Sequence, residues 1–257
     1  AFQLGIGCGG TVHIVLQPIL AELHYLHLAE VQEQLSQGGM GLYSQLIATD
    51  GAVENRWEIS QLSTDRSTQR SSPELIEKNN QTWLLTHLSP PPHLLVIGAG
   101  VDAQPVVQMA KTLGWTVTLW DSRPANGRRD YFMSADQILH QPLNELMEHG
   151  SAIHWNAAVL MSHNLQMDAD AIKALQGSAI GYLALLGPAS RKQQVLALAQ
   201  LDEKELSIPL AGPAGLNLGA ELPEGIALSI LAECHAVLHG ATAQSLNGVL
   251  AAVSETS

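Results

Sequence analysis

Residues 93–121 read HLLVIGAGVDAQPVVQMAKTLGWTVTLWD, a pattern that predicts a strand, a glycine turn, a helix and a second strand ending in an acid. The apolar run over residues 94–97 is typical of a strand buried on both faces. Gly98 permits the tight turn, Gly100 lets the backbone approach a phosphate, and Ala103 lets the helix pack closely on the strand. The N-terminal amides of the helix then face an anion. This stretch therefore predicts a nucleotide-binding type of fold.

Two carboxylates in this stretch lead to different predictions. Asp121, at the end of the second strand, is placed to accept hydrogen bonds from ribose hydroxyls. Asp102 lies in the first turn of the predicted helix, where a carboxylate stabilises the helix dipole but repels a pyrophosphate. Either Asp102 only stabilises its helix, or the crevice holds something other than an ordinary dinucleotide.

The composition excludes several classes of protein. The chain has 257 residues, is 46% hydrophobic and carries a formal net charge of −12, which argues against nucleic-acid binding. Its apolar runs are shorter than the roughly 20 residues of a membrane span. Two cysteines make no disulfide framework, so we expect a soluble cytoplasmic protein. The chain opens without Met inside an apolar, glycine-rich segment, and we expect further residues to precede it in the natural protein.

The first third of the chain predicts a smaller α+β domain. We expect strands over residues 12–16, 40–49, 56–62 and 83–88, and a helix over residues 21–35. The proline-rich stretch 89–92 predicts a stiff linker. We therefore place the domain boundary there, with one domain at 1–89 and a second at 90–257.

Strands and helices alternate through the second domain, which predicts an α/β, Rossmann-like parallel sheet with right-handed crossovers. The expected strands are 94–97, 116–120, 157–162 and 182–186, and the expected helices are 103–113, 168–175, 191–200 and 224–239. Ligands of such sheets bind beyond the carboxyl ends of the strands. Those ends are residues 98–100, 121–123, 162–164 and 187–188.

A second glycine-rich turn, GIGCGG at residues 5–10, surrounds a cysteine. Gly7 and Gly9 leave the backbone amides beside Cys8 free to bind an anion or to lower the pKa of the thiol. Cys8 is therefore either a ligand-contacting, sulfur-handling thiol or a small apolar residue in a tight turn.

Polar residues follow the other strands. His163 and Asn164 come directly after the strand expected at 157–162, where His163 is a candidate acid, base or hydrogen-bond donor. The alternative is a loop histidine beside the start of a helix. Arg123, Arg128 and Arg129 either contact a phosphate or form a solvated loop.

The turn-rich segment 213–221 precedes the last helix. Gly215 and Glu221 are candidate ligand-binding residues within it, although Glu221 also suits the start of a helix. Pro223 is typical of the first helical position. No HExxH or CxxC pattern occurs, so we expect no metal site.

Read together, these motifs resemble the XdhC/CoxI family of maturation factors for molybdenum hydroxylases. The resemblance lies in five segments: GIGCGG at 5–10, PPHLLVIGAGVDA at 91–103, AVLMSHNLQMD at 158–168, GYLALLGPASRK at 181–192 and GPAGLNLGAELPEGIALSILAE at 212–233. The family pattern has a further upstream region with its own glycine-flanked cysteine, which this sequence lacks. Ala211 also stands where many members have a histidine.

The resemblance implies a non-catalytic chaperone that binds molybdenum cofactor (molybdopterin). Such a protein would present the cofactor to a cysteine desulfurase for sulfuration and deliver it to an apo-molybdenum hydroxylase. Cys8 would lie near the metal or its sulfur ligands, and His163 and Asn164 would line the crevice. Gly98, Gly100 and Asp121 would hold a pterin or nucleotide part of the ligand.

Two other functions remain open from the sequence. The strand–glycine–helix–acid unit is also that of an NAD(P)-dependent oxidoreductase, although no clear catalytic pair accompanies it. A regulatory nucleotide sensor is the third possibility. A homodimer is the default assembly for a soluble protein of this kind.

Overall fold

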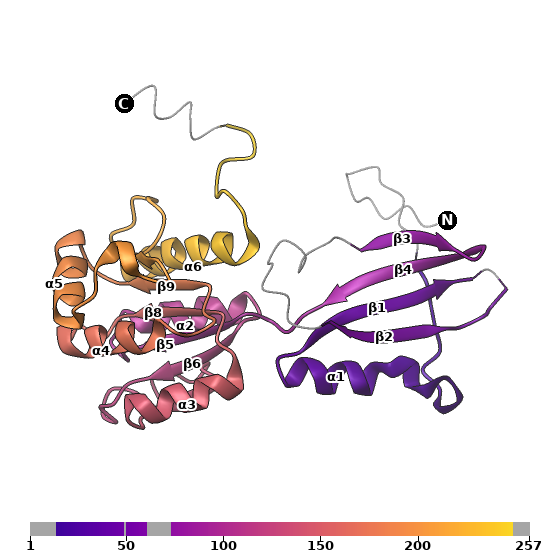
Figure 1. Cartoon of the computed structure of the whole chain (residues 1–257), viewed down its shortest axis with the longest axis horizontal. Coiled ribbons are helices and arrows are strands. Elements are labelled where there is room, and N and C mark those ends of the chain that lie inside the picture. The colour runs from indigo at the N-terminus through magenta and orange to yellow at the C-terminus, as the bar shows by residue number, and fades with distance from the viewer. Residues whose placement is uncertain (1–13, 49, 61–72, 249–257) are drawn as a thin grey trace. The chain divides into compact units, whose positions relative to one another are not determined.

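The computed structural model describes residues 14–48, 50–60 and 73–248. It divides the chain into two compact units, residues 1–90 and 91–257, each with its own sheet (Figure 1). Within the described ranges, no helix combines the length and the apolar character needed to cross a membrane.

The first unit is built on an antiparallel sheet with the strand order β2-β1-β4-β3. Its elements are the 3-10 helix η1 (Ala21–His27), α1 (Leu28–Ser36), β1 (Met40–Ile47), β2 (Asn55–Ser60), β3 (Glu74–Lys78) and β4 (Gln81–Leu88). Asn79 and Asn80 join β3 to β4 with φ of +55° and +58°, the backbone that a two-residue hairpin turn requires. This Asn-Asn turn is the signal for β3, a strand that the sequence prediction lacks.

The helix expected over residues 21–35 is correct only in its second half. His24 to His27 all have positive φ, so η1 contains a left-handed turn and regular α-helix starts only at Leu28. Leu26 in this turn is buried, and its carbonyl oxygen accepts a hydrogen bond from the Tyr43 hydroxyl at 2.7 Å. Leucine spacing does not predict this contact, because Tyr43 comes from the sheet.

The strands expected in this unit agree with the structure in part. The strand expected at 12–16 is wrong for residues 14–16, which form no strand, and residues 12 and 13 lie outside the described ranges. The strands expected at 40–49 and 56–62 correspond to β1 and β2, with residues 49, 61 and 62 also outside. The strand expected at 83–88 is β4, which begins earlier, at Gln81.

The second unit is an α/β domain around a parallel sheet with the strand order β10-β9-β8-β5-β6-β7, which confirms the predicted fold class. Its strands are β5 (His93–Ile97), β6 (Thr116–Trp120), β7 (Gln137–Leu139), β8 (Ala157–Leu160), β9 (Tyr182–Leu185) and β10 (Leu210–Ala211). Its helices are α2 (Ala103–Thr112), α3 (Leu143–Ile153), α4 (Leu165–Leu175), α5 (Ala189–Ala199), the short 3-10 helix η3 (Glu203–Glu205) and α6 (Pro223–His239).

Helices cover both faces of this sheet, as the apolar strands predict. Along β5, Leu94 and Val96 face one core, which also contains buried residues of α2 and α6. Leu95 and Ile97 face the opposite core, with buried residues of α3, α4 and α5. Alternate side chains of the strand therefore bury themselves on opposite faces.

The sequence prediction lacks β7, α3 and β10 of this unit. β7 and β10 are edge strands of three and two residues, too short to show a period. α4 begins at Leu165 rather than 168, because Asn164 caps it with a side-chain oxygen. Pro223 is the first residue of α6, as expected.

The strand order decides which loops meet. β5 lies between β6 and β8, and all three run in the same direction. The glycine turn after β5 is therefore flanked by Asp121 after β6 and by residues 162–164 after β8. These three loops form the candidate site, at the sheet edge where α/β domains bind ligands.

Candidate functional site

The turn after β5 is pressed against the end of β8. Gly98 has φ of +107°, and a Cβ at this position would overlap the main chain of Ser162. Its amide donates to the Trp120 carbonyl oxygen at 2.8 Å, while the Met161 amide donates to the Ile97 carbonyl oxygen at 2.7 Å. The predicted need for glycine at position 98 thus comes from backbone conformation and from a close neighbour together.

Asp121 is buried, and its carboxylate already has protein partners. Oδ2 accepts from the Ala99 amide at 2.9 Å and from Arg123 Nη2 at 2.8 Å. Oδ1 accepts from the amide and from Nε of Arg123, at 2.9 and 2.8 Å. The side chain is 0% exposed. Asp121 therefore binds the Ala99 amide of the glycine turn. The sequence had instead suggested that its carboxylate accepts hydrogen bonds from ribose hydroxyls.

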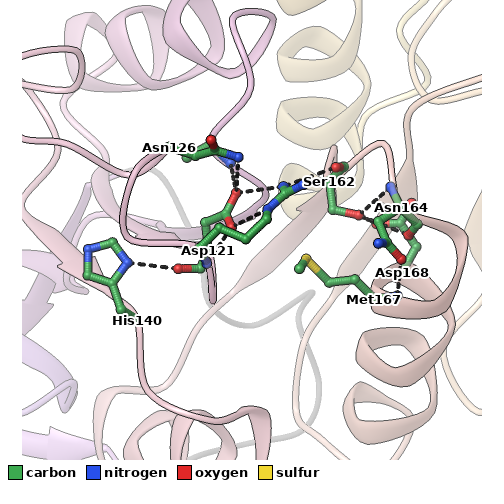
Figure 2. Close-up of polar contacts among 9 residues, drawn as sticks. Asp121, Asn126, His140, Ser162, Asn164, Met167 and Asp168 are labelled. Atoms are coloured by element: carbon green, nitrogen blue, oxygen red, sulfur yellow. Dashed lines mark hydrogen bonds and ion pairs between the residues drawn. The ribbon is translucent and has the colours of Figure 1, made fainter.

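The surroundings of Asp121 keep its carboxylate charged. Burial acts to raise the pKa, but the hydrogen bonds from Arg123 and from the Ala99 amide, with the Arg123 charge, outweigh it and lower the pKa below 3.8. The same pair raises the pKa of the Arg123 guanidinium. The main-chain oxygen of Asp121 also accepts from His140 Nδ1 at 2.7 Å (Figure 2).

Arg123 links two strand ends. Besides holding Asp121 after β6, its Nη2 donates to the Ser162 carbonyl oxygen after β8 at 3.2 Å. The side chain is 43% exposed. Within residues 14–48, 50–60 and 73–248, its Nη1 has no hydrogen-bond partner. Arg123 therefore keeps N–H donors of Nη1 unused in a partly exposed side chain at this edge of the sheet.

The other two arginines of the predicted cluster are used elsewhere. Arg128 pairs with Asp130 at 2.9 Å, and both side chains are more than half exposed. Arg129 donates to the Ala135 carbonyl oxygen at 2.5 Å. Among the contacts of the described residues, Arg123 is the one of the three arginines that touches the candidate site.

A second charged pair, Asp168 with Arg191, is connected to Ser162 by a hydrogen bond. The Ser162 hydroxyl donates to Asp168 Oδ1 at 2.5 Å and accepts from the Asn164 amide at 3.1 Å (Figure 2). Asp168 Oδ2 pairs with Arg191 at 2.6 Å, and the Asp168 side chain is 1% exposed. One chain of polar contacts thus runs from the end of β6, past the end of β8, to α5. Its members in order are Asp121, Arg123, Ser162, Asp168 and Arg191.

Asn164 and His163 have different roles. Asn164 Oδ1 accepts from the Met167 amide at 3.0 Å, so this residue starts α4, one of the two roles that the sequence left open. His163 has φ of +55°, and its Nε2 lies 3.2 Å from Asp102 Oδ2. A Cβ at Gly100 would lie 3.4 Å from His163 Cδ2, which places the imidazole beside the glycine turn.

The His163–Asp102 pair is the feature that sequence reasoning missed. Both residues stood out separately, but the sequence offered no sign that they meet, because their pairing depends on β8 lying next to β5. The side chains are 58% and 35% exposed, so the pair faces solvent. The imidazole and the carboxylate are both accessible to a ligand at this edge of the sheet.

Gly215 serves the packing of α6. It has φ of +98°, and a Cβ there would overlap the Ser229 hydroxyl. Its amide donates to Glu233 Oε2 at 2.9 Å, and the Tyr182 hydroxyl donates to the same oxygen at 2.6 Å. Glu221 is exposed and lies just before the N-terminal cap of α6. Within the part of the chain that the structure describes, the contacts of Gly215 lead to α6, and no hydrogen bond joins Gly215 or Glu221 to the glycine turn after β5.

The structure describes one of the two cysteines, Cys234. Gly7, Cys8 and Gly9 lie outside the described residues. Cys234 is 0% exposed in the core beneath α6. Burial, together with the Glu233 charge, raises the pKa of its thiol far above the ordinary value. Cys234 is therefore unsuited to sulfur chemistry.

Comparisons with known proteins match the chain across this site. The family described as the XdhC Rossmann domain matches residues 94–234. A probable xanthine dehydrogenase subunit from Bacillus subtilis (strain 168) is 28% identical over 242 residues, which are 91% of this chain and 71% of that relative. The Escherichia coli (strain K12) protein YqeB is 34% identical over 146 residues, 55% of this chain and 26% of its own length.

A solved structure has the same fold. The crystal structure of a xanthine dehydrogenase from Bacillus halodurans superposes with a TM-score of 0.67 at 23% sequence identity. The match covers 89% of this chain and 68% of the other. The two proteins therefore share a fold over most of this chain.

Proposed function

The chain belongs to the family of the XdhC Rossmann domain, and from this membership we propose that it is an accessory protein of a xanthine dehydrogenase-type molybdenum hydroxylase. Its cargo in this proposal is molybdenum cofactor, which it binds, holds for sulfuration and passes to the apo-enzyme. The observation that carries the proposal is that the family match spans the glycine turn, Asp121, Arg123 and the His163 loop as one ordered set.

The charges at the sheet edge suit a ligand that carries a phosphate. Molybdopterin carries one phosphate ester, polar pterin edges and a sulfur-rich metal centre. Arg123 is oriented by two side-chain hydrogen bonds to Asp121 and is 43% exposed, and its unused Nη1 suits a phosphate oxygen. His163 and Asp102 together provide a donor and an acceptor for a pterin edge.

The remaining assignments are proposals that rest on the family. Cys8 contacts the metal or its sulfur ligands, a cysteine desulfurase supplies the sulfur, and the apo-hydroxylase receives the finished cofactor. Cys234 does not compete for this role, because its thiol is buried and its pKa is raised. We place these steps in the cytoplasm and expect the protein to act as a homodimer.

The NAD(P)-dependent oxidoreductase is the alternative, and the contacts of Asp121 argue against it. Both carboxylate oxygens are engaged by Ala99 and Arg123, so no free acceptor remains for ribose hydroxyls. The His163–Asp102 pair supplies the acid–base couple that the sequence had not offered. An oxidoreductase also needs a bound dinucleotide to exchange hydride with its substrate, and the acid that would anchor the ribose is already occupied.

The test is cofactor binding by the purified protein with a matched pair of variants. Arg123→Lys keeps a cation beside Asp121 but removes the planar fork that presents Nη1, so we expect molybdenum cofactor to bind about tenfold more weakly. Arg128→Lys makes the same change in an exposed pair with Asp130 and leaves binding unchanged. Hydroxylase maturation in a cell extract should follow the same order.

Two results would contradict the proposal. One is wild-type protein that fails to bind molybdenum cofactor at micromolar concentration. The other is apo-hydroxylase that matures at the same rate in extracts with and without the protein. Equal loss in both lysine variants would show that Arg123 is not the phosphate contact.

A further inference from the structure

Two histidines lie one helical turn apart near the end of α6. The ring centroids of His235 and His239 are 3.7 Å apart, and the two ring planes are inclined by 24°. Residues four positions apart on a helix share one face, with their Cβ atoms about 5–6 Å apart. His235 is exposed and His239 is partly exposed, so both imidazoles are accessible. Two accessible nitrogen ligands are therefore close together on this face of the helix.

A backbone carbonyl group fixes the tautomer of His239. Its Nδ1 lies 2.8 Å from the carbonyl oxygen of His235, which can only accept a hydrogen bond. Nδ1 therefore carries the proton, and the neutral ring keeps a lone pair on Nε2. A histidine that ligates a metal almost always donates its other ring N–H to a carbonyl or carboxylate oxygen. His239 thus already makes the hydrogen bond that orients a metal ligand.

Trp115 orients the other histidine. Its ring lies nearly parallel to that of His235, with centroids 6.1 Å apart and planes inclined by 11°. Trp115 is 2% exposed and belongs to the core beneath α6, so packing holds the indole in place. The rings of Trp115, His235 and His239 therefore form one stack. Two side chains that are already ordered lose less conformational freedom when they bind a ligand together.

The ligand atoms and the local charge select the class of ion. Neutral imidazole suits Cu²⁺, Ni²⁺ and Zn²⁺, whereas Mg²⁺ and Ca²⁺ prefer oxygen ligands. His239 is the last residue of α6, and the carboxyl end of a helix favours a cation. Among the described residues, no group of three or more histidines, cysteines or acids could hold a metal ion, so water would complete the coordination of an ion on the two histidines.

We propose that His235 and His239 form a two-nitrogen binding site for a divalent transition-metal ion, which binds Cu²⁺ more tightly than Ni²⁺ or Zn²⁺. The pair spans the last turn of α6, so a bound ion ties this turn together and stabilises the folded protein. The sequence predicted no metal site, because residue spacing shows neither the contact between the rings nor the tautomer of His239. The site goes beyond the proposed function and does not depend on it.

Calorimetric titration of the whole chain with Cu²⁺ tests the site. We expect His235→Gln and His239→Gln each to weaken the binding of one Cu²⁺ ion at least about tenfold. The double variant should weaken the same ion and no second one, because the two rings share it. His87→Gln removes an exposed histidine of β4 and is the matched control, which should bind Cu²⁺ as the wild-type protein does. Titration with Mg²⁺ should not distinguish any of these proteins.

The results separate the proposal from its alternatives. Unchanged Cu²⁺ binding in both single variants overturns it, and so does a double variant that loses two ions, since the histidines would then bind separately. Thermal melting without metal establishes that each variant is folded, and Cu²⁺ should raise the melting midpoint of the wild-type protein more than that of His239→Gln. The proposed function is tested separately, because His239→Gln should bind molybdenum cofactor as the wild-type protein does.

Discussion

The Asp121 carboxylate accepts four hydrogen bonds within 2.9 Å, and this set of partners decides what the residue can do. Three of these bonds come from Arg123 and one from the Ala99 amide of the glycine turn. A carboxylate with such partners stabilises the folded chain as an ion. Asp121 therefore ties the end of β6 to the turn after β5, and through Arg123 to the end of β8.

Replacing Asp121 should weaken the fold in a pH-dependent way. Asp121→Asn loses charge-assisted hydrogen bonds, and we expect the free energy of unfolding at pH 7 to fall by about 2 kcal/mol. The folded-state pKa of Asp121 lies below its ordinary value of 3.8. The stability that the ionised carboxylate adds to the wild-type protein is therefore complete above pH 3.8 and is lost as pH falls through the folded-state pKa. Urea unfolding at pH 7 and at pH 3 measures both values. A difference that stays constant with pH would contradict this account.

The buried Cys234 leads to a second prediction at this scale. The thiolate is the reactive form, and burial together with the raised pKa keeps Cys234 protonated and out of reach. In a Cys8→Ser variant, we expect no thiol to react with Ellman's reagent within minutes in native buffer, and one thiol to react in urea. The wild-type chain in urea should show two. Rapid reaction of the native variant would mean that Cys234 is accessible.

At the scale of elements, the turn between β5 and α2 depends on the neighbouring strand. Gly98 takes a conformation that other residues avoid and lies against the Ser162 main chain. The same turn lies beside the His163 ring, and its Ala99 amide donates to the Asp121 carboxylate. The conformation of this turn thus depends on contacts with the ends of β6 and β8 as well as on its own strand, β5.

A pair of glycine variants separates backbone strain from contact. Gly114, at the end of α2, has φ of +79° with nothing within 4 Å of an added Cβ, so Gly114→Ala should cost about 1 kcal/mol from strain alone. Gly98→Ala adds an overlap with Ser162 main chain and should cost about 3 kcal/mol or more. Urea unfolding compares the two. Equal costs would show that the β5 turn can move away from β8.

At the scale of the whole molecule, the second unit has cores of its own. Every residue of the two large buried clusters belongs to residues 91–257, with Leu94 and Leu95 on opposite faces of the same strand. One core lies under α2 and α6 and the other under α3, α4 and α5. A unit with complete cores is expected to fold independently.

A fragment of residues 91–257 should therefore unfold cooperatively without the first unit. We expect its thermal midpoint to lie within about 5 °C of the transition that the same unit shows in the whole chain. Circular dichroism follows the helices, and fluorescence follows Trp115, Trp120 and Trp155, which are all buried. A broad, non-cooperative loss of signal would show that the first unit is needed to complete the fold.

Much of the second unit was predictable because its signals are local. The run 94–97, the glycine turn and the apolar face of α2 lie within a few residues of one another, and parallel strands buried on both faces leave a continuous apolar pattern. The first unit was harder. Its left-handed turn at His24–His27 and the Asn79-Asn80 hairpin depend on backbone conformations that leucine spacing does not reveal.

The candidate site shows the same division. Its location at the carboxyl ends of the strands, and the presence of Asp121, Arg123 and His163 there, follow from residue order and from the rules of parallel sheets. Their partners do not. Arg123 meets Ser162 across 39 positions of chain, and His163 meets Asp102 only because β8 pairs with β5.

The amino-acid pattern was thus sufficient for the α/β class, for the glycine turn and for the family, since these rest on interactions between residues close in the chain. The partners of each charged group required the folded structure. Strand order brings Asp102 to His163 and Arg123 to Ser162. Arg123 lies two positions after Asp121, and with the Ala99 amide it engages the carboxylate that the sequence had suggested as a ribose anchor. Contacts between distant segments depend on the whole sheet, which no local pattern encodes.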